Sequence, residues 1–454
     1  MSIKQAIEGI CPPVLLGVKR RVETSSLASR LIRGTFWSLV GTVLSRLLGL
    51  AASMFVARMI GRAGMGELGI IQSTVGMFSS LAGLSLGLAA TKHIAECRVK
   101  DPIGAGETIG FLSLLSWCSG AGMTLVVFGL APWLARHTLM APALAPQLQA
   151  GSLLLFFGVI NGVQTGVLSG FEAFKRIAQI NFLSGVANFS LVVGGACLAG
   201  LSGVVAGLVI ALALNCGLNF FGVRREASAS GIAIRFKNFH RQWGLLWGFG
   251  VPGTLSGFIS GPVGWSTSTE LVRQPGGYAD MGIYNVTNTW FQAVAFLPDL
   301  LAQVLLPILS SFHAAKDNRG TNRALALATW TNVAIVVPVI VVAGLLSRFI
   351  MGLYGPDFVR GWPVMVLTML SAGVLMVQGP ITNHLVAASR MWAYFWAHIL
   401  WGGMFLAGAF LLVPGHGAVG LAAARLIAYV LNGLWIAAVV WTHAVRMRKQ
   451  TNLG

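Results

Sequence analysis

Five polar side chains recur along one apolar stretch of the chain, residues 281–312. They are Asn285, Asn288, Gln292, Asp299 and Gln303, and their spacings of 3, 4, 7 and 4 residues place them on one face of an α-helix. Amides in such a row can hydrogen-bond a hydroxyl-rich solute. The alternative is hydrogen bonding between packed helices, worth about 0.6 kcal/mol for each bond. Five polar groups in line exceed that need, and we favour a polar lumen.

Two arginines lie inside other apolar stretches. Arg46 lies about halfway along residues 34–60, and Arg425 lies one helical turn before Tyr429 in the last apolar stretch. A guanidinium group stays charged and offers a planar fork that fits phosphate, so we expect both arginines to bind an anionic group. The alternative is a structural ion pair of either arginine with Asp299.

Further candidates are acids and prolines. Asp299 is the main candidate for coupling an ion to movement, followed by Glu67, Glu270 and Asp280 at the outer mouth. Pro252 and Pro262 lie in a glycine-rich stretch and predict a kinked or broken helix that could act as a hinge, because proline removes a backbone hydrogen bond. The complete predicted substrate-binding set is Arg46, Asn161, Asn285, Asn288, Gln292, Gln303, Arg425 and Tyr429.

The elements that position these residues follow from composition. The 454 residues are 56% hydrophobic and only 10% charged, whereas soluble domains carry about 25% charged residues. This excludes a soluble enzyme and predicts an all-α polytopic membrane protein. No Walker A, HExxH, GxSxG or CxxC motif occurs, and the histidines are scattered. We therefore expect no enzyme activity, no cofactor and no metal site.

Twelve stretches reach the length of about 20 apolar residues that a membrane helix needs. They are 34–60, 66–91, 107–133, 148–171, 177–199, 200–222, 244–269, 281–312, 325–349, 362–388, 391–413 and 416–442.

Basic residues alternate between the loops that join these stretches. If both termini are cytoplasmic, 23 of the 31 Lys and Arg lie on the cytoplasmic side and 6 on the other, as the positive-inside rule requires. The net charge of +18 then reflects topology and lipid head groups, not a nucleic-acid partner.

An internal repeat divides the chain. Gly200–Asn215 matches Gly417–Asn432 at seven of sixteen positions, and Glu67–Ile70 parallels Asp280–Ile283. Each pair links one span to the sixth span after it, so the halves share one orientation, as in transporters with parallel repeats. We expect two six-helix bundles around a central cavity. The expected parts are a basic cytoplasmic segment (1–33), the first bundle (34–222), a cytoplasmic linker (223–243), the second bundle (244–445) and a cytoplasmic tail (446–454).

Several patches carry a family resemblance. Ser45-Arg46-x-x-Gly49 followed by Val56-Ala57-Arg58 and Gly61, Phe171-Glu172, and Gly417-Ala-Val-Gly420 resemble the polysaccharide-export flippases of the multidrug/oligosaccharidyl-lipid/polysaccharide superfamily. The likeness implies a polyprenyl-pyrophosphate-linked oligosaccharide, such as an O-antigen or exopolysaccharide repeat unit, moved to the outer leaflet of the bacterial inner membrane. The related lipid II flippases carry an Arg-Asp pair where this chain has Ala52-Ser53, which argues against a peptidoglycan precursor.

The sequence thus predicts a flippase that works by alternating access. Its expected partners are the lipid-linked oligosaccharide, membrane lipids and the polysaccharide polymerase or glycosyltransferase machinery. The first alternative is a cation-coupled multidrug exporter of the same superfamily, which would favour acidic cavity residues. A membrane-embedded glycan polymerase or ligase is the second, but it would need a large outer loop with catalytic groups, and the loops here are short.

Overall fold

The computed structural model describes residues 26–83, 85–237, 251–314, 318–387 and 391–451. Within these ranges the chain is helical and contains no strand. The elements are α3 (Ser26–Ala82), α4 (Leu86–Lys100), α5 (Pro102–Trp133), η1 (Leu134–Thr138), η2 (Pro142–Leu144), α6 (Ala145–Gly170), α7 (Phe174–Ala229), α9 (Val251–Val272), α10 (Gly277–Ala314), α11 (Asn318–Leu345), α12 (Ser347–Gly352), η4 (Pro356–Gly361), α13 (Trp362–Ala387) and α14 (Met391–Thr451).

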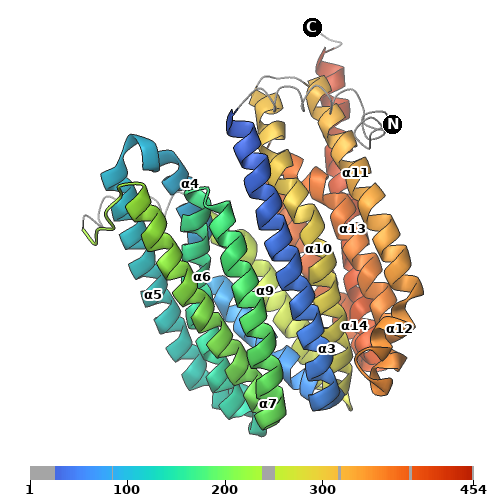
Figure 1. Cartoon of the computed structure of the whole chain (residues 1–454). Coiled ribbons are helices and arrows are strands. Elements are labelled where there is room, and N and C mark those ends of the chain that lie inside the picture. The colour runs from blue at the N-terminus through green and yellow to red at the C-terminus, as the bar shows by residue number, and fades with distance from the viewer. Residues whose placement is uncertain (1–25, 84, 238–250, 315–317, 388–390, 452–454) are drawn as a thin grey trace, which may run out of the picture.

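Seven helices in the described ranges are long and apolar enough to cross a membrane. Figure 1 shows the long helices running along one common axis, with α5, α6 and α7 on one side and α11, α13 and α14 on the other. Many large apolar side chains point outward, among them Leu125, Leu198 and Leu411, which are 72%, 89% and 80% exposed. Lipid can cover such a surface and water cannot do so cheaply. The chain is a multi-pass membrane protein.

Two of the longest helices are hairpins. A side chain at Gly195 would overlap the carbonyl oxygen of Gly203, and one at Gly408 would contact Ala424 at 3.1 Å. The two arms of α7, and the two arms of α14, therefore lie side by side. The 57-residue α3 also contains a non-helical residue, Gly61.

The predicted repeat is visible in the backbone of these hairpins. Gly200 turns α7 with φ 54° and ψ −132°, and Gly417, its partner at an offset of 217 residues, turns α14 with φ 53° and ψ −129°. Only glycine adopts this region without strain. The two matching segments thus fold into the same turn.

The loops lie at two ends of the molecule. The start of α3, the end of α14 and the segment after α7 lie at one end in Figure 1, and α12 and the turn of α7 lie at the other. We call the first the basic end, because the helix ends and the segment after α7 carry these basic residues there: Arg98, Lys100, Lys175, Arg176, Arg224, Arg225, Arg235 and Lys237. The second is called the far end. This segregation matches the alternation expected from the sequence.

The two halves of the chain meet through glycines on α3 and α10. A side chain at Gly66 would overlap the carbonyl oxygen of Tyr278, and one at Gly282 would overlap that of Arg62. Backbones that approach this closely leave no room for a Cβ atom. The amide of Asn285 then donates to the carbonyl of Met65 at 3.1 Å.

Hydrogen bonds extend this contact between the halves. Trp265 Nε1 donates to Thr74 Oγ1 at 3.1 Å, and Arg58 Nε donates to the carbonyl of Leu353 at 2.8 Å. At the far end Tyr278 donates to the carbonyl of Leu139 at 2.7 Å. The far end is therefore closed by packing and hydrogen bonds between the halves.

Several helix ends differ from the expected bounds. Helix α7 continues to Ala229, past the expected end at residue 222, and α3 begins at Ser26. Helix α9 runs without interruption through Pro262. Residues 1–25 and 238–250, which include most of the expected basic segment and part of the expected linker, lie outside the described residues.

The two matching glycines provide a test of the repeat turn. Gly200→Ala places a Cβ in open space, whereas Gly417→Ala places it against the Asp280 carboxylate. We expect Gly200→Ala to cost about 1–3 kcal/mol of stability from backbone strain alone. Gly417→Ala should cost more, because the carboxylate must also move. Thermal unfolding of the two purified variants beside wild type measures this order, and equal melting temperatures would contradict it.

Candidate functional site

Arg425 is a charged residue buried inside the second half. It lies eight residues after the Gly417 turn, on the second arm of α14, and is only 4% exposed. Its Nη1 donates to Oδ1 of Asn288 on α10 at 3.0 Å. Its Nε and Nη2 are buried and have no hydrogen-bond partner among the described residues. The guanidinium therefore has donors left for a ligand.

Aromatic rings surround this guanidinium. Its central carbon lies 4.5 Å from the ring centre of Phe291 and 5.1 Å from that of Tyr284. The ring of Tyr429 stacks on Phe291, with centres 6.4 Å apart, and on Trp401, with centres 5.6 Å apart. We call this group the Arg425 cluster; its members are Tyr284, Asn288, Phe291, Trp401, Arg425 and Tyr429.

The cluster holds the positive charge without neutralising it. Cation–π contacts give about 2 kcal/mol when desolvated, and one neutral acceptor adds a charge-assisted hydrogen bond of about 1.5–3 kcal/mol. A buried charge costs several kcal/mol when it lacks a counter-charge. No ion pair of Arg425 with a carboxylate is found among the described residues. An anion that reached Nε and Nη2 would supply the counter-charge and the hydrogen-bond acceptors that these two atoms lack.

The first half contains a polar cavity of about 400 Å³ between α3, α6 and α7. We call it the amide cavity, because its lining includes the side chains of Ser45, Gln72, Ser184, Asn188 and Asn215. All five are uncharged donors and acceptors of the kind that bind hydroxyl groups. The amide cavity therefore suits a neutral, hydroxyl-rich ligand.

Asn161 is tied to the amide cavity through Asn219. The amide of Asn219 donates to Oδ1 of Asn161 at 2.7 Å and to Oδ1 of Asn215 at 2.5 Å. Asn215 in turn lines the amide cavity. Arg46 adjoins Ser45, another lining residue, and is exposed. Two of the predicted residues thus lie in or beside the polar part of the first half.

The amide row on α10 serves more than one purpose. Asn288 binds Arg425, and Gln292, one turn further on, is exposed. Asn285 instead packs against Gly69 of α3 and bonds to the backbone there. The structure thus brings together Asn288, Arg425 and Tyr429, and it assigns Asn285 to the contact between the halves.

Several predicted site residues lie away from the Arg425 cluster and the amide cavity, and others lie outside the described residues. Glu270 accepts a hydrogen bond from Gln274 at 2.9 Å, and Glu67 is half-buried on α3. Pro262 lies inside α9. The side chains of Pro252, Asp299 and Gln303 lie outside the described residues, so their roles stay predictions. In the described part of the chain, no three His, Cys, Asp or Glu side chains gather as metal ligands.

Sequence reasoning missed Gln72 and Asn215 as site residues, although the repeat contained the signal. The offset of 213 residues pairs Gln72 with Asn285, and the offset of 217 pairs Asn215 with Asn432. Projecting each polar residue of one half onto the other would have found both. Asn188 and Trp401 carry no comparable signal.

A helical membrane bundle with a buried arginine in one half and a cavity with polar lining residues in the other is an arrangement found in membrane transporters. Residues 31–313 match the family described as polysaccharide biosynthesis protein. That match covers more than half of the chain, and the chain belongs to this family.

Two curated relatives are transport proteins. A Shigella flexneri protein named as an O-antigen transporter is 25% identical over 345 residues, which cover 71% of this chain and 76% of the relative. The EPS I polysaccharide export inner membrane protein EpsE of Ralstonia nicotianae is 23% identical over 239 residues, which cover 50% of this chain and 52% of EpsE. These relatives are transporters and not catalysts of a chemical reaction.

Solved structures show the same fold. The lipid II flippase MurJ in an inward closed conformation matches with a TM-score of 0.71 at 14% identity, covering 89% of this chain and 87% of MurJ. An inward-facing multidrug resistance transporter of the MATE family matches with a TM-score of 0.69 at 14% identity, covering 90% of this chain and 98% of that one. The chain has the fold of the multidrug/oligosaccharidyl-lipid/polysaccharide superfamily.

The contact between Asn288 and Arg425 predicts a difference between two kinds of substitution. Asn288→Asp places a carboxylate on Nη1 of Arg425 and neutralises the charge that would attract an anion to Nε and Nη2. We therefore expect transport to fall while the melting temperature holds or rises. Asn288→Leu removes the hydrogen bond and should cost about 1.5–3 kcal/mol of stability. Surface glycan and thermal unfolding measure the two effects.

The matched control is Asn332→Asp on α11. Asn332 is also a buried amide, 4% exposed, but it bonds to the carbonyl of Met376 and not to a cation. There the new carboxylate has no positive partner and should lower the melting temperature. An Asn288→Asp protein that transports normally would show that Arg425 takes no external anion.

Proposed function

We propose that this protein is a flippase for polyprenyl-pyrophosphate-linked oligosaccharide. It carries the O-antigen or exopolysaccharide repeat unit from the cytoplasmic to the periplasmic leaflet by alternating access. In this proposal twelve membrane helices form two six-helix bundles, 34–222 and 244–445, around a central cavity. Both termini and the linker are cytoplasmic, and the membrane is the bacterial inner membrane. Membership of the family and the relatives' names support the substrate class.

The observation that carries the proposal is the buried Arg425 with two unused donors. A pyrophosphate carries negative oxygens that fit the guanidinium fork. Because the site is shielded from water, each charge-assisted bond counts for more than it would on the surface. We assign the pyrophosphate or an acidic sugar to the Arg425 cluster, and Arg46 to the same task from the first half.

The neutral polar groups would bind the sugar. The amide cavity, with Asn161 behind it, offers hydrogen bonds to hydroxyl groups. Gln292 and Gln303 extend the row on α10. The prenyl tail would stay in lipid, which already gives it an apolar environment. Sugar and phosphate would thus each contact both halves, and separating the halves would release both.

Movement would open the far end. The glycines that join α3 to α10 and the hydrogen bonds around them close that end in this conformation. We propose that Pro252 and Pro262 let α9 bend as the contact opens. Asp299 is the proposed ion-coupling residue, with Glu67 and Glu270 as further candidates. The polymerase and glycosyltransferase machinery would act on either side of this step.

The alternative is a cation-coupled multidrug exporter, which the fold neighbour of the MATE family supports. Cationic drugs favour acidic cavity residues. Two charged side chains are buried among the described residues, Arg425 and Glu107 of α5. Only Arg425 belongs to the proposed substrate sites, where it would repel a cation. A drug-resistance assay in a strain that expresses this protein separates the two functions.

The first test substitutes Arg425 in a strain that lacks its own copy of the gene. Arg425→Ala should lower surface glycan by about tenfold or more, because it removes one or more charge-assisted bonds of about 1.5–3 kcal/mol each. Arg425→Lys keeps the charge without the fork and should be intermediate. Lipid-linked oligosaccharide should accumulate on the cytoplasmic side.

The control is Arg348→Ala. Arg348 is exposed and lies over the ring of Trp362 at 5.0 Å, so it repeats the arginine–aromatic contact outside the proposed sites. It should support normal glycan levels. Normal levels in a folded Arg425→Ala protein would refute the site, and unchanged glycan after deletion of the gene would refute the function.

Two further substitutions test Arg46 and Asp299, which have proposed roles but are not members of the Arg425 cluster. Arg46→Ala removes the proposed second anion ligand, and Asp299→Asn removes the proposed ion-coupling carboxylate while keeping its shape. Each should abolish surface glycan while the protein still reaches the membrane, as judged by membrane fractionation. Wild-type glycan in either variant would remove that residue from the mechanism.

A further inference from the structure

A second cavity of about 400 Å³ lies outside the proposed transport route. Helices α5, α6 and the second arm of α7 form it together with the segment that follows α7. Its lining is mainly apolar and includes Trp117, Val163 and Phe220, with Gln164 and Arg224 as polar members. Its volume falls in the range of ligand pockets, roughly 300–1,000 Å³.

One wall of this cavity is the extended segment of residues 232–237, which we call the strap. Its backbone lies against α5, where the amide of Arg235 donates to the carbonyl of Gly106 at 3.1 Å. Any side chain at Gly106 or Gly110 would overlap a strap carbonyl oxygen. Ile232 is buried, and Ile234 and Phe236 line the cavity. The strap leads from the first half of the chain toward the second.

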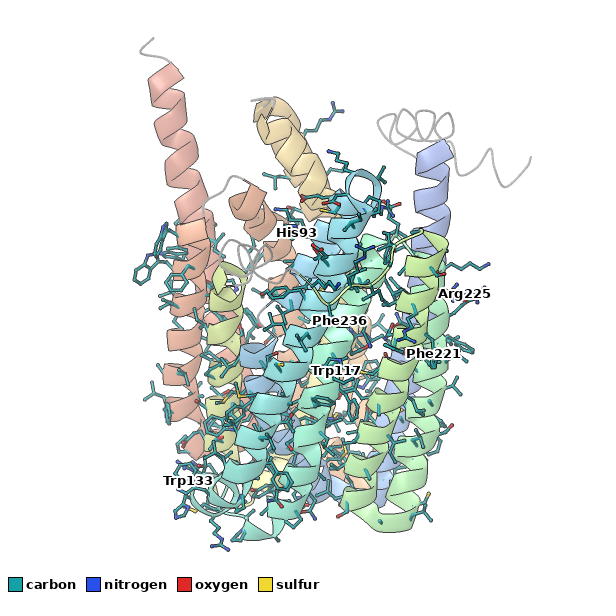
Figure 2. The ribbon with its side chains drawn as sticks, turned by 90° about the vertical axis from the view of Figure 1, so that its left-hand side faces the viewer. His93, Trp117, Trp133, Phe221, Arg225 and Phe236 are labelled. Atoms are coloured by element: carbon teal, nitrogen blue, oxygen red, sulfur yellow. The ribbon has the colours of Figure 1, made fainter. Side chains whose placement is uncertain are left out.

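The cavity lies under a surface of exposed aromatic side chains. Trp117, Phe221 and Phe236 are 55%, 69% and 58% exposed, and Figure 2 shows them on one face of the molecule, with Arg225 nearby. In a membrane protein such a face meets lipid, and aromatic rings gather at the depth of the head groups. The molecules that can reach an apolar cavity here are lipid chains.

The rim of the cavity is positively charged. The guanidinium of Arg224 lines the cavity and lies 4.5 Å from the ring centre of Phe220. Arg225 is exposed one residue further along α7. No carboxylate pairs with Arg224 among the described residues. Basic pockets of this kind between membrane helices bind anionic lipid head groups.

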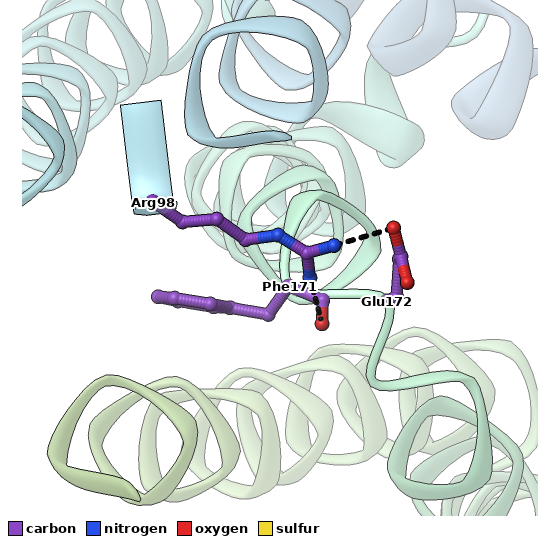
Figure 3. Close-up of polar contacts among 3 residues, drawn as sticks. All are labelled: Arg98, Phe171 and Glu172. Atoms are coloured by element: carbon purple, nitrogen blue, oxygen red, sulfur yellow. Dashed lines mark hydrogen bonds and ion pairs between the residues drawn. The ribbon is translucent and has the colours of Figure 1, made fainter. Parts of the chain in front are cut away.

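Two carboxylates near the cavity, Glu172 and Glu226, are paired with arginines other than Arg224. Arg98 binds both the carboxylate of Glu172 and the carbonyl of Phe171, as Figure 3 shows. Arg176 pairs with Glu226 at 2.6 Å. Because Glu172 and Glu226 are already paired, these two acids do not neutralise Arg224.

A buried polar group within the cavity points to the same class of ligand. The Oε1 atom of Gln164 is buried and has no hydrogen-bond partner among the described residues. Leaving such a group unsatisfied costs about 1–3 kcal/mol. A phospholipid carries polar ester and head groups next to its apolar chains, so one molecule can meet both the apolar walls and this amide.

We propose that this cavity binds one anionic phospholipid from the leaflet at the basic end. An acyl chain fills the space between Trp117, Val163 and Phe220, and the phosphate lies at the rim with Arg224. Because the strap forms one wall, the bound lipid holds the connection between the halves against α5. The site is independent of the substrate proposed above.

Native mass spectrometry of the full-length protein, titrated with lipids of identical acyl chains, tests the proposal. Wild type should bind one phosphatidylglycerol at least about fivefold more tightly than phosphatidylcholine. Arg224→Ala should reduce that preference to less than about twofold. Val163→Trp, which fills the cavity, should lower the binding of both lipids.

Two controls keep the result interpretable. Arg348→Ala removes an exposed arginine over an aromatic ring at the far end, and Leu125→Trp enlarges an exposed side chain of α5 outside the cavity. Both should bind phosphatidylglycerol as wild type does. If the charge variant Arg224→Ala fails to fold, Arg224→Gln is compared with Arg224→Lys, which should keep the preference.

The proposal would be overturned by equal affinity for the two lipids, or by a preference that survives in the folded charge variants. Displacement of phosphatidylglycerol by polyprenyl phosphate at equal concentration would also overturn it, since the cavity would then hold the substrate's tail. Surface glycan is not the readout, so a wrong substrate assignment leaves this test intact.

Discussion

The architecture depends on the backbone contact between α3 and α10. Gly66 and Gly282 let the two helices approach until one helix touches the other's carbonyl oxygens. In lipid there is no hydrophobic force to press helices together, so close packing and interhelical hydrogen bonds have to hold them. This contact joins the first half to the second, and the bond from Asn285 to Met65 makes it specific. An alternating-access protein must be able to break such a contact, and small residues keep its area modest.

A membrane also dictates which polar groups can exist. Each polar side chain inside it needs a partner, and most of those described here have one: Asn219 bonds to two amides, Asn285 to a carbonyl, and Trp265 to a threonine. Arg425 is charged, and two of its three guanidinium nitrogens have no hydrogen-bond partner among the described residues. A group that costs free energy to keep unsatisfied is the natural place for a ligand, which is why the proposed function rests on it.

The sequence predicted the helical class, the segregation of charge and the repeat, because each follows from composition, spacing or local backbone chemistry. Gly200 and Gly417 show this well, since a matching sequence produced a matching turn. Some of the residues predicted to form the site are neighbours in the structure, and their role in binding is a proposal. Asn288, Arg425 and Tyr429 do meet, but periodicity placed Asn285 in the same role, whereas the structure gives it to α3. A helical face has neighbours on two sides, and spacing alone cannot say which neighbour a residue meets. Trp401 and Phe291 escaped notice because aromatic residues in apolar helices look like ordinary packing.

The Asp280 carboxylate accepts a hydrogen bond from the backbone N–H of Ala418 at 3.0 Å, at the start of the arm that carries Arg425. Asn288, eight residues along α10, bonds to Arg425, seven residues along α14. Two hydrogen bonds therefore join α10 to α14, and they lie roughly 10–12 Å apart along the helix axes. An anion that draws Arg425 away from Asn288 would break that hydrogen bond and leave the one between Asp280 and Ala418 intact. Substrate binding would then separate α10 from α14, beginning at the Arg425 cluster and increasing toward the basic end.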